Sequence, residues 1–162
     1  MVATIILGVV LLTAGTIYIS SIKELARSAD EVKVQREASF ALDHIFLNML
    51  PGKDIADADN VGGFPRASIV VTVSVSGVDK KIKYSLNGTN LIYDPPYTTA
   101  LPVAANSEII ATGITVLRFD RQLDNNIDGT IIKNYVTIYV TATGDRMHES
   151  YSTGVVLRGM NG

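Results

Sequence analysis

The 162-residue sequence has no cysteine, no tryptophan and only two histidines. Without cysteine the chain cannot form disulfides, thiolate nucleophiles, zinc–cysteine sites or iron–sulfur clusters. Lysine and arginine total 14 against 16 aspartates and glutamates, so the net charge is -2 and no nucleic-acid-binding surface is predicted. The Gly-x-Gly-x-x-Gly, Walker and Gly-x-Ser-x-Gly motifs are also missing. We therefore expect no enzymatic activity and no resident cofactor, apart from the calcium candidate described below.

Charge is also missing from residues 1–22, which read MVATIILGVVLLTAGTIYISSI. A helix of that length spans roughly 30 Å, the thickness of a bilayer core. The segment is longer than the hydrophobic region of a signal peptide, which basic residues normally precede. We predict a hydrophobic helix that lipid or copies of itself must bury. Its predicted assembly residues are Met1, Ile5, Leu7, Gly8, Val10, Leu11, Leu12 and Gly15.

Within that segment, residues 13–21 (TAGTIYISS) are mostly threonine, isoleucine, serine and glycine, which form helices less readily than alanine or leucine. We expect this stretch to be the weakest part of the helix and to be partly unwound. Gly8 and Gly15 either let neighbouring helices approach closely or are simply tolerated in a membrane span.

The helical period continues through residues 23–50. Apolar residues recur at helical spacing at Ile22, Leu25, Ala29, Val32, Ala38, Leu42, Ile45, Phe46 and Met49. Opposite charges lie one turn apart in three pairs, Arg27 with Glu31, Asp30 with Lys33 and Lys33 with Glu37. Pro51 and Gly52 end the pattern. The simplest account is one helix of about 50 residues, roughly 75 Å long, whose amphipathic second half packs on its own domain.

Residues 51–162 predict an antiparallel β domain, which makes the fold α+β. After a loop at 53–65, strands are predicted at 67–76, 80–86, 91–93, 114–119, 130–143 and 150–158. Turns are predicted at 77–79 and at Asn87-Gly88, and Pro95-Pro96 is expected to break a strand. We expect five or six mostly antiparallel strands, with one sheet face packed on the helix.

The run DNNIDG matches the opening of a calcium-binding loop. Asp124, Asn126 and Asp128 would supply oxygen ligands at alternate positions around a glycine turn, and Asp120 would add another. The twelfth position is Tyr135 instead of the glutamate that completes such a loop. The pattern therefore predicts either a calcium (Ca2+) site or a solvated Asp-Gly hairpin turn.

One further pattern concerns glycosylation. Asn87, Gly88 and Thr89 form an Asn-x-Thr sequon, which is an acceptor only in an organism that glycosylates such sites. The alternative is an unmodified hairpin turn.

The uncharged N-terminal segment, the unbroken helix and the small antiparallel domain together resemble type IV pilins and the pseudopilins of type II secretion. The run ARSADEVKVQREASFALDHIFLNML at 26–50 is similar to the helix of the minor pilin and pseudopilin J-like group. ITVLRFDRQLDNNIDG at 114–129 and YSTGVVLRG at 151–159 resemble the same group. The chain departs from that family at Ile5, where an acidic residue is usual, and at Ile22, where a helix-breaking proline is common.

The resemblance implies a structural subunit of an extracellular type IV pilus-like filament or secretion pseudopilus, polymerising through its hydrophobic N-terminal helix. Its partners would be copies of itself, other pilin-like subunits and, before assembly, the inner membrane. We expect a basic leader to have been removed in front of Met1, because the positive-inside rule would otherwise place the domain in the cytoplasm. The alternative is a membrane-anchored periplasmic or extracellular binding module.

Overall fold

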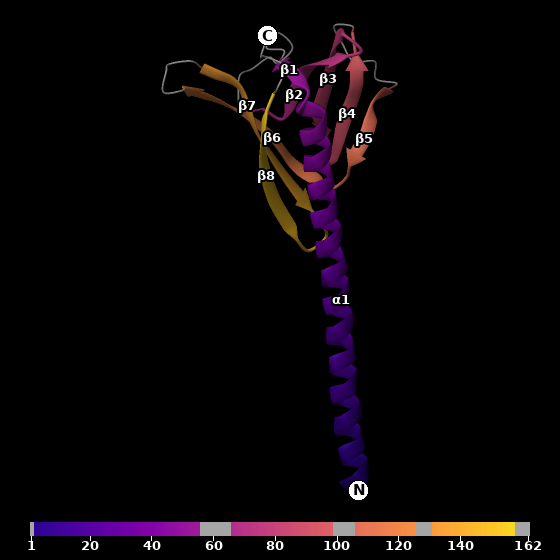
Figure 1. Ribbon diagram of the computed structural model, residues 1–162. Coiled ribbons are helices and arrows are strands. Elements are labelled where there is room, and N and C mark those ends of the chain that lie inside the picture. The colour runs from indigo at the N-terminus through magenta and orange to yellow at the C-terminus, as the bar shows by residue number, and fades with distance from the viewer. Residues whose placement is uncertain (1, 56–65, 99–105, 126–130, 158–162) are drawn as a thin grey trace.

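The computed structural model describes residues 2–55, 66–98, 106–125 and 131–157, without the side chains of residues 2, 4, 122–125 and 131–134. One long helix, α1 (Val2–Met49), carries a β domain around its C-terminal end (Figure 1). At 1.5 Å per residue the 48-residue helix is about 72 Å long. The predicted α+β fold is confirmed, and α1 ends before Pro51 as expected.

The helix is continuous through residues 13–21, so the predicted unwinding there is wrong. Thr13 Oγ1 donates to the carbonyl oxygen of Val10 (2.9 Å), and Ser21 Oγ donates to that of Ile17 (2.9 Å). Hydroxyl groups that would otherwise compete with the backbone are therefore satisfied inside the helix itself. The low intrinsic propensity of these residues does not interrupt a helix that continues on both sides.

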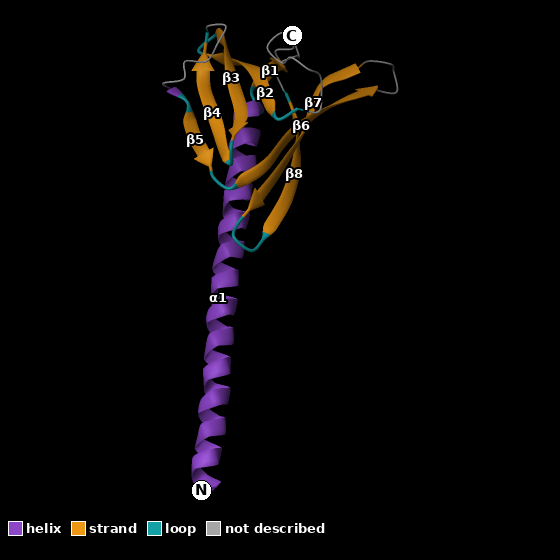
Figure 2. Ribbon diagram, turned by 180° about the vertical axis from the view of Figure 1, so that it is seen from behind, coloured by secondary structure: helices purple, strands orange, loops and turns teal. Residues whose placement is uncertain are grey.

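Two antiparallel sheets lie against the last turns of α1 (Figure 2). The first contains β1 (Gly52–Ile55), β2 (Ser68–Val75), β3 (Val78–Asn87), β4 (Asn90–Tyr97) and β5 (Glu108–Ala111), paired in that order. The second contains β6 (Ile114–Asn125), β7 (Ile131–Thr143) and β8 (His148–Val156). An isolated bridge between Arg66 and Phe119 joins the sheets, and α1 packs against β5, β7 and β8.

The described part of the chain thus has eight strands in two sheets, instead of the five or six strands predicted. β1 occupies part of the predicted loop. It has too few residues to show the alternation of apolar and polar residues that predicts a strand, and only its backbone pairing with β2 makes it one. β4 continues through Pro95 and Pro96, which were expected to break it. These two prolines lie where the register with β3 shifts, so the strand absorbs them as a bulge.

Both predicted hairpins of the first sheet are present. Ser76 (φ 54°) and Gly77 (φ 78°) form the two-residue turn between β2 and β3, one residue earlier than predicted. Gly88 (φ 62°) and Thr89 form the turn between β3 and β4. A positive φ at the first turn position is the feature that primed hairpin turns require.

The core lies between the two sheets and one face of α1. The helix contributes Val34, Ala38, Ala41, Leu42, Ile45 and Met49, all of which are buried. The predicted stripe is thus confirmed from Ala38 onward, but Leu25 is 71% exposed and Val32 is 61% exposed. Leu25 precedes the part of α1 that the domain covers, which begins at about residue 30, and Val32 lies on the face of α1 away from the buried residues.

Candidate functional site

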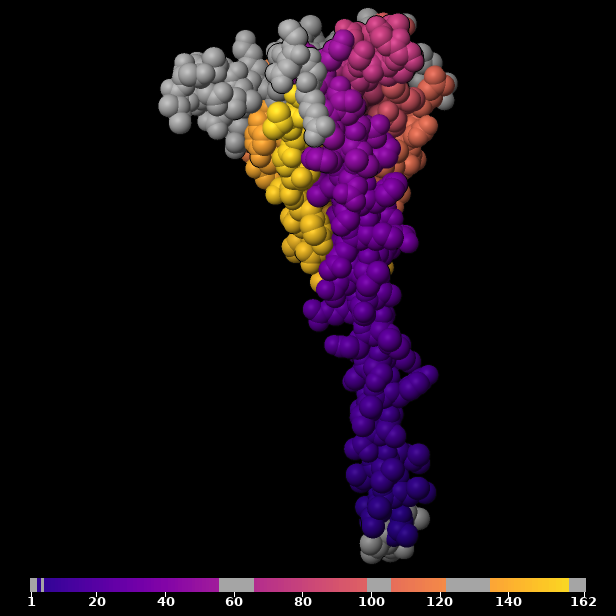
Figure 3. Space-filling view, in the orientation of Figure 1, coloured from indigo at the N-terminus to yellow at the C-terminus, as the bar shows by residue number. Residues whose placement is uncertain are grey.

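The first half of α1 extends away from the domain, and we call its residues 3–29 the bare segment (Figure 3). Every described side chain from Ala3 to Ala29 is exposed, and none of the most hydrophobic 18-residue stretch is buried. Of the predicted assembly residues, Met1 lies outside the described residues. The others all lie on this bare segment, namely Ile5, Leu7, Gly8, Val10, Leu11, Leu12 and Gly15.

The bare segment is an apolar surface that water does not solvate favourably. Ile5, Val10 and Leu12 are 67%, 54% and 72% exposed, and neither Gly8 nor Gly15 has a heavy atom within 4 Å of the position of a Cβ. An exposed apolar surface of this extent marks a membrane or protein interaction site. The helix is long and apolar enough to cross a membrane, and the two glycines leave room for another helix to approach.

Asp30 fixes the lower edge of the domain to α1. Its carboxylate accepts hydrogen bonds from the backbone N–H groups of Asp145 (3.3 Å) and Arg146 (2.9 Å), in the turn between β7 and β8. A Cβ at Gly144 would overlap this carboxylate, so the turn approaches the helix at a residue without a side chain.

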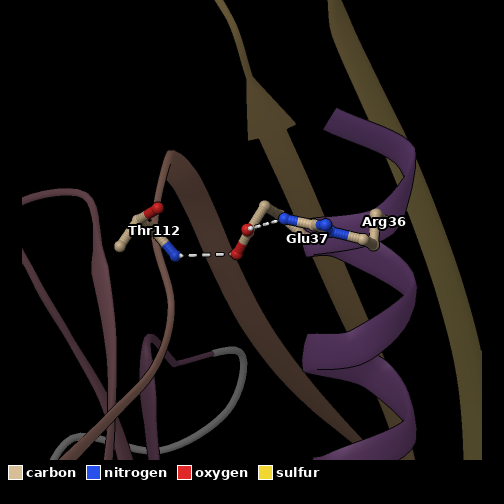
Figure 4. Close-up of polar contacts among 3 residues, drawn as sticks. All are labelled: Arg36, Glu37 and Thr112. Atoms are coloured by element: carbon tan, nitrogen blue, oxygen red, sulfur yellow. Dashed lines mark hydrogen bonds and ion pairs between the residues drawn. The ribbon is translucent and has the colours of Figure 1, made fainter. Parts of the chain in front are cut away.

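Glu37 makes the corresponding contact with the other sheet (Figure 4). Its Oε2 accepts from the backbone N–H of Thr112 (3.2 Å), which lies between β5 and β6, and its Oε1 is 3.6 Å from Arg36 Nη2. Among the described residues, the three predicted ion pairs within the helix do not form. Asp30 and Glu37 bind backbone N–H groups of the domain instead, which removes the unpaired donors of two turns.

A polar and aromatic cluster joins the end of α1 to the first sheet. The ring of His44 lies 5.0 Å from that of Tyr93 and 5.9 Å from that of Tyr84, measured between centroids. Its Nδ1 is 2.9 Å from the Tyr84 hydroxyl, and Asn48 Nδ2 donates to the His44 carbonyl oxygen (2.8 Å). Burial lowers the pKa of His44 below its usual value, although the negative charge of Glu108 opposes this shift. The neutral imidazole is therefore favoured at the junction.

The calcium candidate falls largely outside the described residues. Asn126 and Asp128 are not among them, and only the backbone of Asp124, in β6, is described. The carboxylate of Asp120, which was expected to add a ligand, is 3.1 Å from the guanidinium of Arg118. Within the ranges that the structure describes, no group of three or more metal-ligating side chains occurs.

The predicted glycosylation residue, Asn87, is exposed at the end of β3. Its sequon occupies the hairpin turn to β4, and the carbonyl oxygen of Thr89 accepts a hydrogen bond from the N–H of Ile114 (2.9 Å). The geometry suits both an accessible acceptor and a plain hairpin turn.

Little in the local pattern of residues indicates the tertiary contacts of Asp30, Glu37 and His44. Asp30 and Glu37 had partners within the helix that were plausible from spacing alone. Tyr84 and Tyr93 are directly paired across β3 and β4, and their place in two strands predicted on either side of one hairpin turn is the one sequence signal for the cluster.

Comparison with protein-family models finds no match for the chain, and no curated protein matches it either.

Proposed function

We propose that the chain is a structural subunit of an extracellular type IV pilus-like filament or secretion pseudopilus that polymerises through the first half of α1. The observation that carries the proposal is the bare apolar segment, which has no charge over residues 1–22 and whose described side chains are all exposed. The domain at the other end of α1 buries its own core and does not use this segment.

The energetics favour association. Residues 1–22 include 15 apolar side chains, and burying each of the larger ones contributes ~1–2 kcal/mol. Lipid would shelter the segment before assembly, and the helices of other copies or of other pilin-like subunits would shelter it afterwards. The protein would therefore pass from an inner-membrane pool to a filament at the cell surface without a chemical reaction of its own.

A charge placed in the middle of the segment tests the proposal. Val10 is 54% exposed on the bare segment and Val78 is 52% exposed on the domain, so the same substitution at Val78 is a matched control. We expect Val10→Asp to abolish filaments of uniform width in electron micrographs, because an unpaired carboxylate would be buried. Val78→Asp should leave them intact, and the circular dichroism of both domains should match that of the parent.

The alternative, a membrane-anchored binding module, makes a different prediction. In that case the native material would contain no filaments, and the chain would be recovered from detergent as a monomer whose helix faces lipid. Normal filaments formed by Val10→Asp would also contradict the proposal.

A further inference from the structure

The free charges of α1 are divided between its two sides. The middle of its open face points away from the buried residues, and each position follows from a turn of about 100° per residue. On one side, about 50° to 170° from that middle, lie three basic residues that we call the basic flank: Lys23, Arg27 and Lys33. On the other side, about 30° to 150° from it, lie three acidic residues that we call the acidic flank: Glu24, Glu31 and Asp43.

Within the part of the chain that the structure describes, none of these six side chains forms an ion pair. Asp30 and Glu37 also stand on the side of the basic flank, but their carboxylates bind backbone N–H groups of the domain. Arg36 lies near the middle of the open face, 3.6 Å from Glu37. The charges that are left for a partner are therefore positive on one side of α1 and negative on the other.

The domain leaves both flanks accessible. Lys33 and Asp43 are exposed where α1 packs on the domain, and Glu31 is half-buried at the lower edge of the domain. The other three members belong to the bare segment, whose described side chains are all exposed. Figure 3 shows α1 on the surface of the domain along its packed length, so a second helix can approach it from either side.

The partner that fits both flanks is a second copy of this chain. The basic flank of one copy and the acidic flank of the next bring opposite charges together, whereas like flanks would place charges of one sign face to face. Lipid does not fit, because hydrocarbon does not solvate charged side chains. A contact between two different surfaces gives each helix two neighbours, so it repeats from copy to copy, and with an axial shift it builds a filament instead of a closed ring.

Asp43 sets the size of that shift, because the basic flank has no member beyond Lys33. A shift of ten residues brings Asp43 of one copy beside Lys33 of another, and a shift of eight brings Glu31 beside Lys23. A shift of about nine residues, or about 13.5 Å, serves both pairs within the reach of these long side chains. Of the shifts that pair Asp43, only this one pairs a second acidic residue.

We infer that α1 helices of neighbouring copies pack in parallel, basic flank against acidic flank, with an axial stagger of about nine residues. Lys33 of one copy then pairs with Asp43 of the next. Ile22 and Val32, which are 48% and 61% exposed in the single chain, come together between the charged pairs and exclude water there. The inference rests on the proposed function, since it assigns the contact between copies in the same filament.

Because the chain has no cysteine, pairs of cysteines can test the contact in the full-length protein. Filaments that carry both Lys33→Cys and Asp43→Cys are oxidised and separated on a non-reducing gel. We expect a ladder of disulfide-linked dimers, trimers and higher multimers. The two positions are about 15 Å apart on one helix, and a disulfide needs Cα atoms within about 7 Å, so no bridge can form within a chain.

The matched control is the double variant K23C/K33C. Its two cysteines are also ten residues apart, but both lie on the basic flank, so it should give several-fold fewer multimers than K33C/D43C. Filaments of K33C/D43C that contain only monomers would overturn the inference. Dimers formed as strongly by Lys33→Cys alone would also overturn it, because they would show like flanks in contact.

A charge exchange gives an independent readout. Lys33→Asp should lower the filament yield several-fold, because it places two carboxylates together, and the double variant K33D/D43K should restore the yield. The thermal melting of the domain should stay the same in both variants. No recovery in the double variant would contradict the pairing of these flanks.

The same measurements separate this inference from the proposed function. Filaments that depend on Val10 but give no ladder from K33C/D43C would leave the function standing and refute the contact between flanks. A parent chain that forms no filaments would refute both.

Discussion

Two neighbouring positions on α1 test which face of the helix stabilises the β domain. Ile45 is fully buried against the sheets, whereas Leu47 is 65% exposed on the opposite face of α1. Ile45→Ala removes three carbon atoms at ~0.8 kcal/mol each and leaves a cavity, so the free energy of unfolding should fall by about 2–5 kcal/mol. Leu47→Ala should change it by no more than about 0.5 kcal/mol.

The assay is urea unfolding of the detergent-solubilised chain, followed by tyrosine circular dichroism. We expect Ile45→Ala to unfold at a lower urea concentration and Leu47→Ala to unfold like the parent. The reasoning would be refuted if Leu47→Ala destabilised the domain as much as Ile45→Ala, because Leu47 would then belong to the core of the single chain.

Three further predictions concern the domain. Because burial lowers the pKa of His44, the unfolded chain binds more protons, so stability should be full above about pH 6.5 and fall as the pH drops below it. Urea titrations between pH 5 and pH 8 should show this slope, and an unchanged slope in His44→Gln would contradict it. Gly52→Ala should cost about 1–3 kcal/mol, since its Cβ would lie 2.8 Å from the Met49 carbonyl oxygen; a thermal melt equal to that of the parent would refute this. Asp30→Ala should speed hydrogen exchange at the amides of Asp145 and Arg146, whereas Glu31→Ala should not.

Periodicity is enough to predict α1 and most of its buried face. Ala38, Leu42, Ile45 and Met49 recur at helical steps, and a helix that buries one face cannot hide that spacing. Leu25 and Val32 recur at similar steps, but they lie on the opposite face of α1 and are exposed. Periodicity shows that a face is apolar and does not show which molecule covers it.

The strands that the sequence did not predict depend on partners distant in the chain. Pro95 and Pro96 normally argue against a strand, but here the two together stand opposite Ile82 alone in β3. Only the neighbouring strand makes that bulge acceptable, so a local rule could not anticipate it.

The candidate site could likewise be predicted only in part. The exposure of the bare segment follows from its composition, since a domain of this size has no surface long enough to cover it. The contacts of Asp30 and Glu37 could not be predicted, because a carboxylate in a charged helix has the same local sequence whether it faces water or a backbone N–H group far along the chain. His44 is similar, since its partner Tyr84 lies 40 residues away.

The two carboxylates that hold the β turns also determine how a pulling force would travel through the molecule. Asp30 binds the turn between β7 and β8, and Glu37 binds the segment between β5 and β6, about 10.5 Å further along the same rod. A single attachment would act as a pivot, but two attachments at different heights, one for each sheet, resist tilting. Tension applied at the N-terminal end of the helix would therefore be shared between both sheets and not borne by the covalent connection at Pro51 alone.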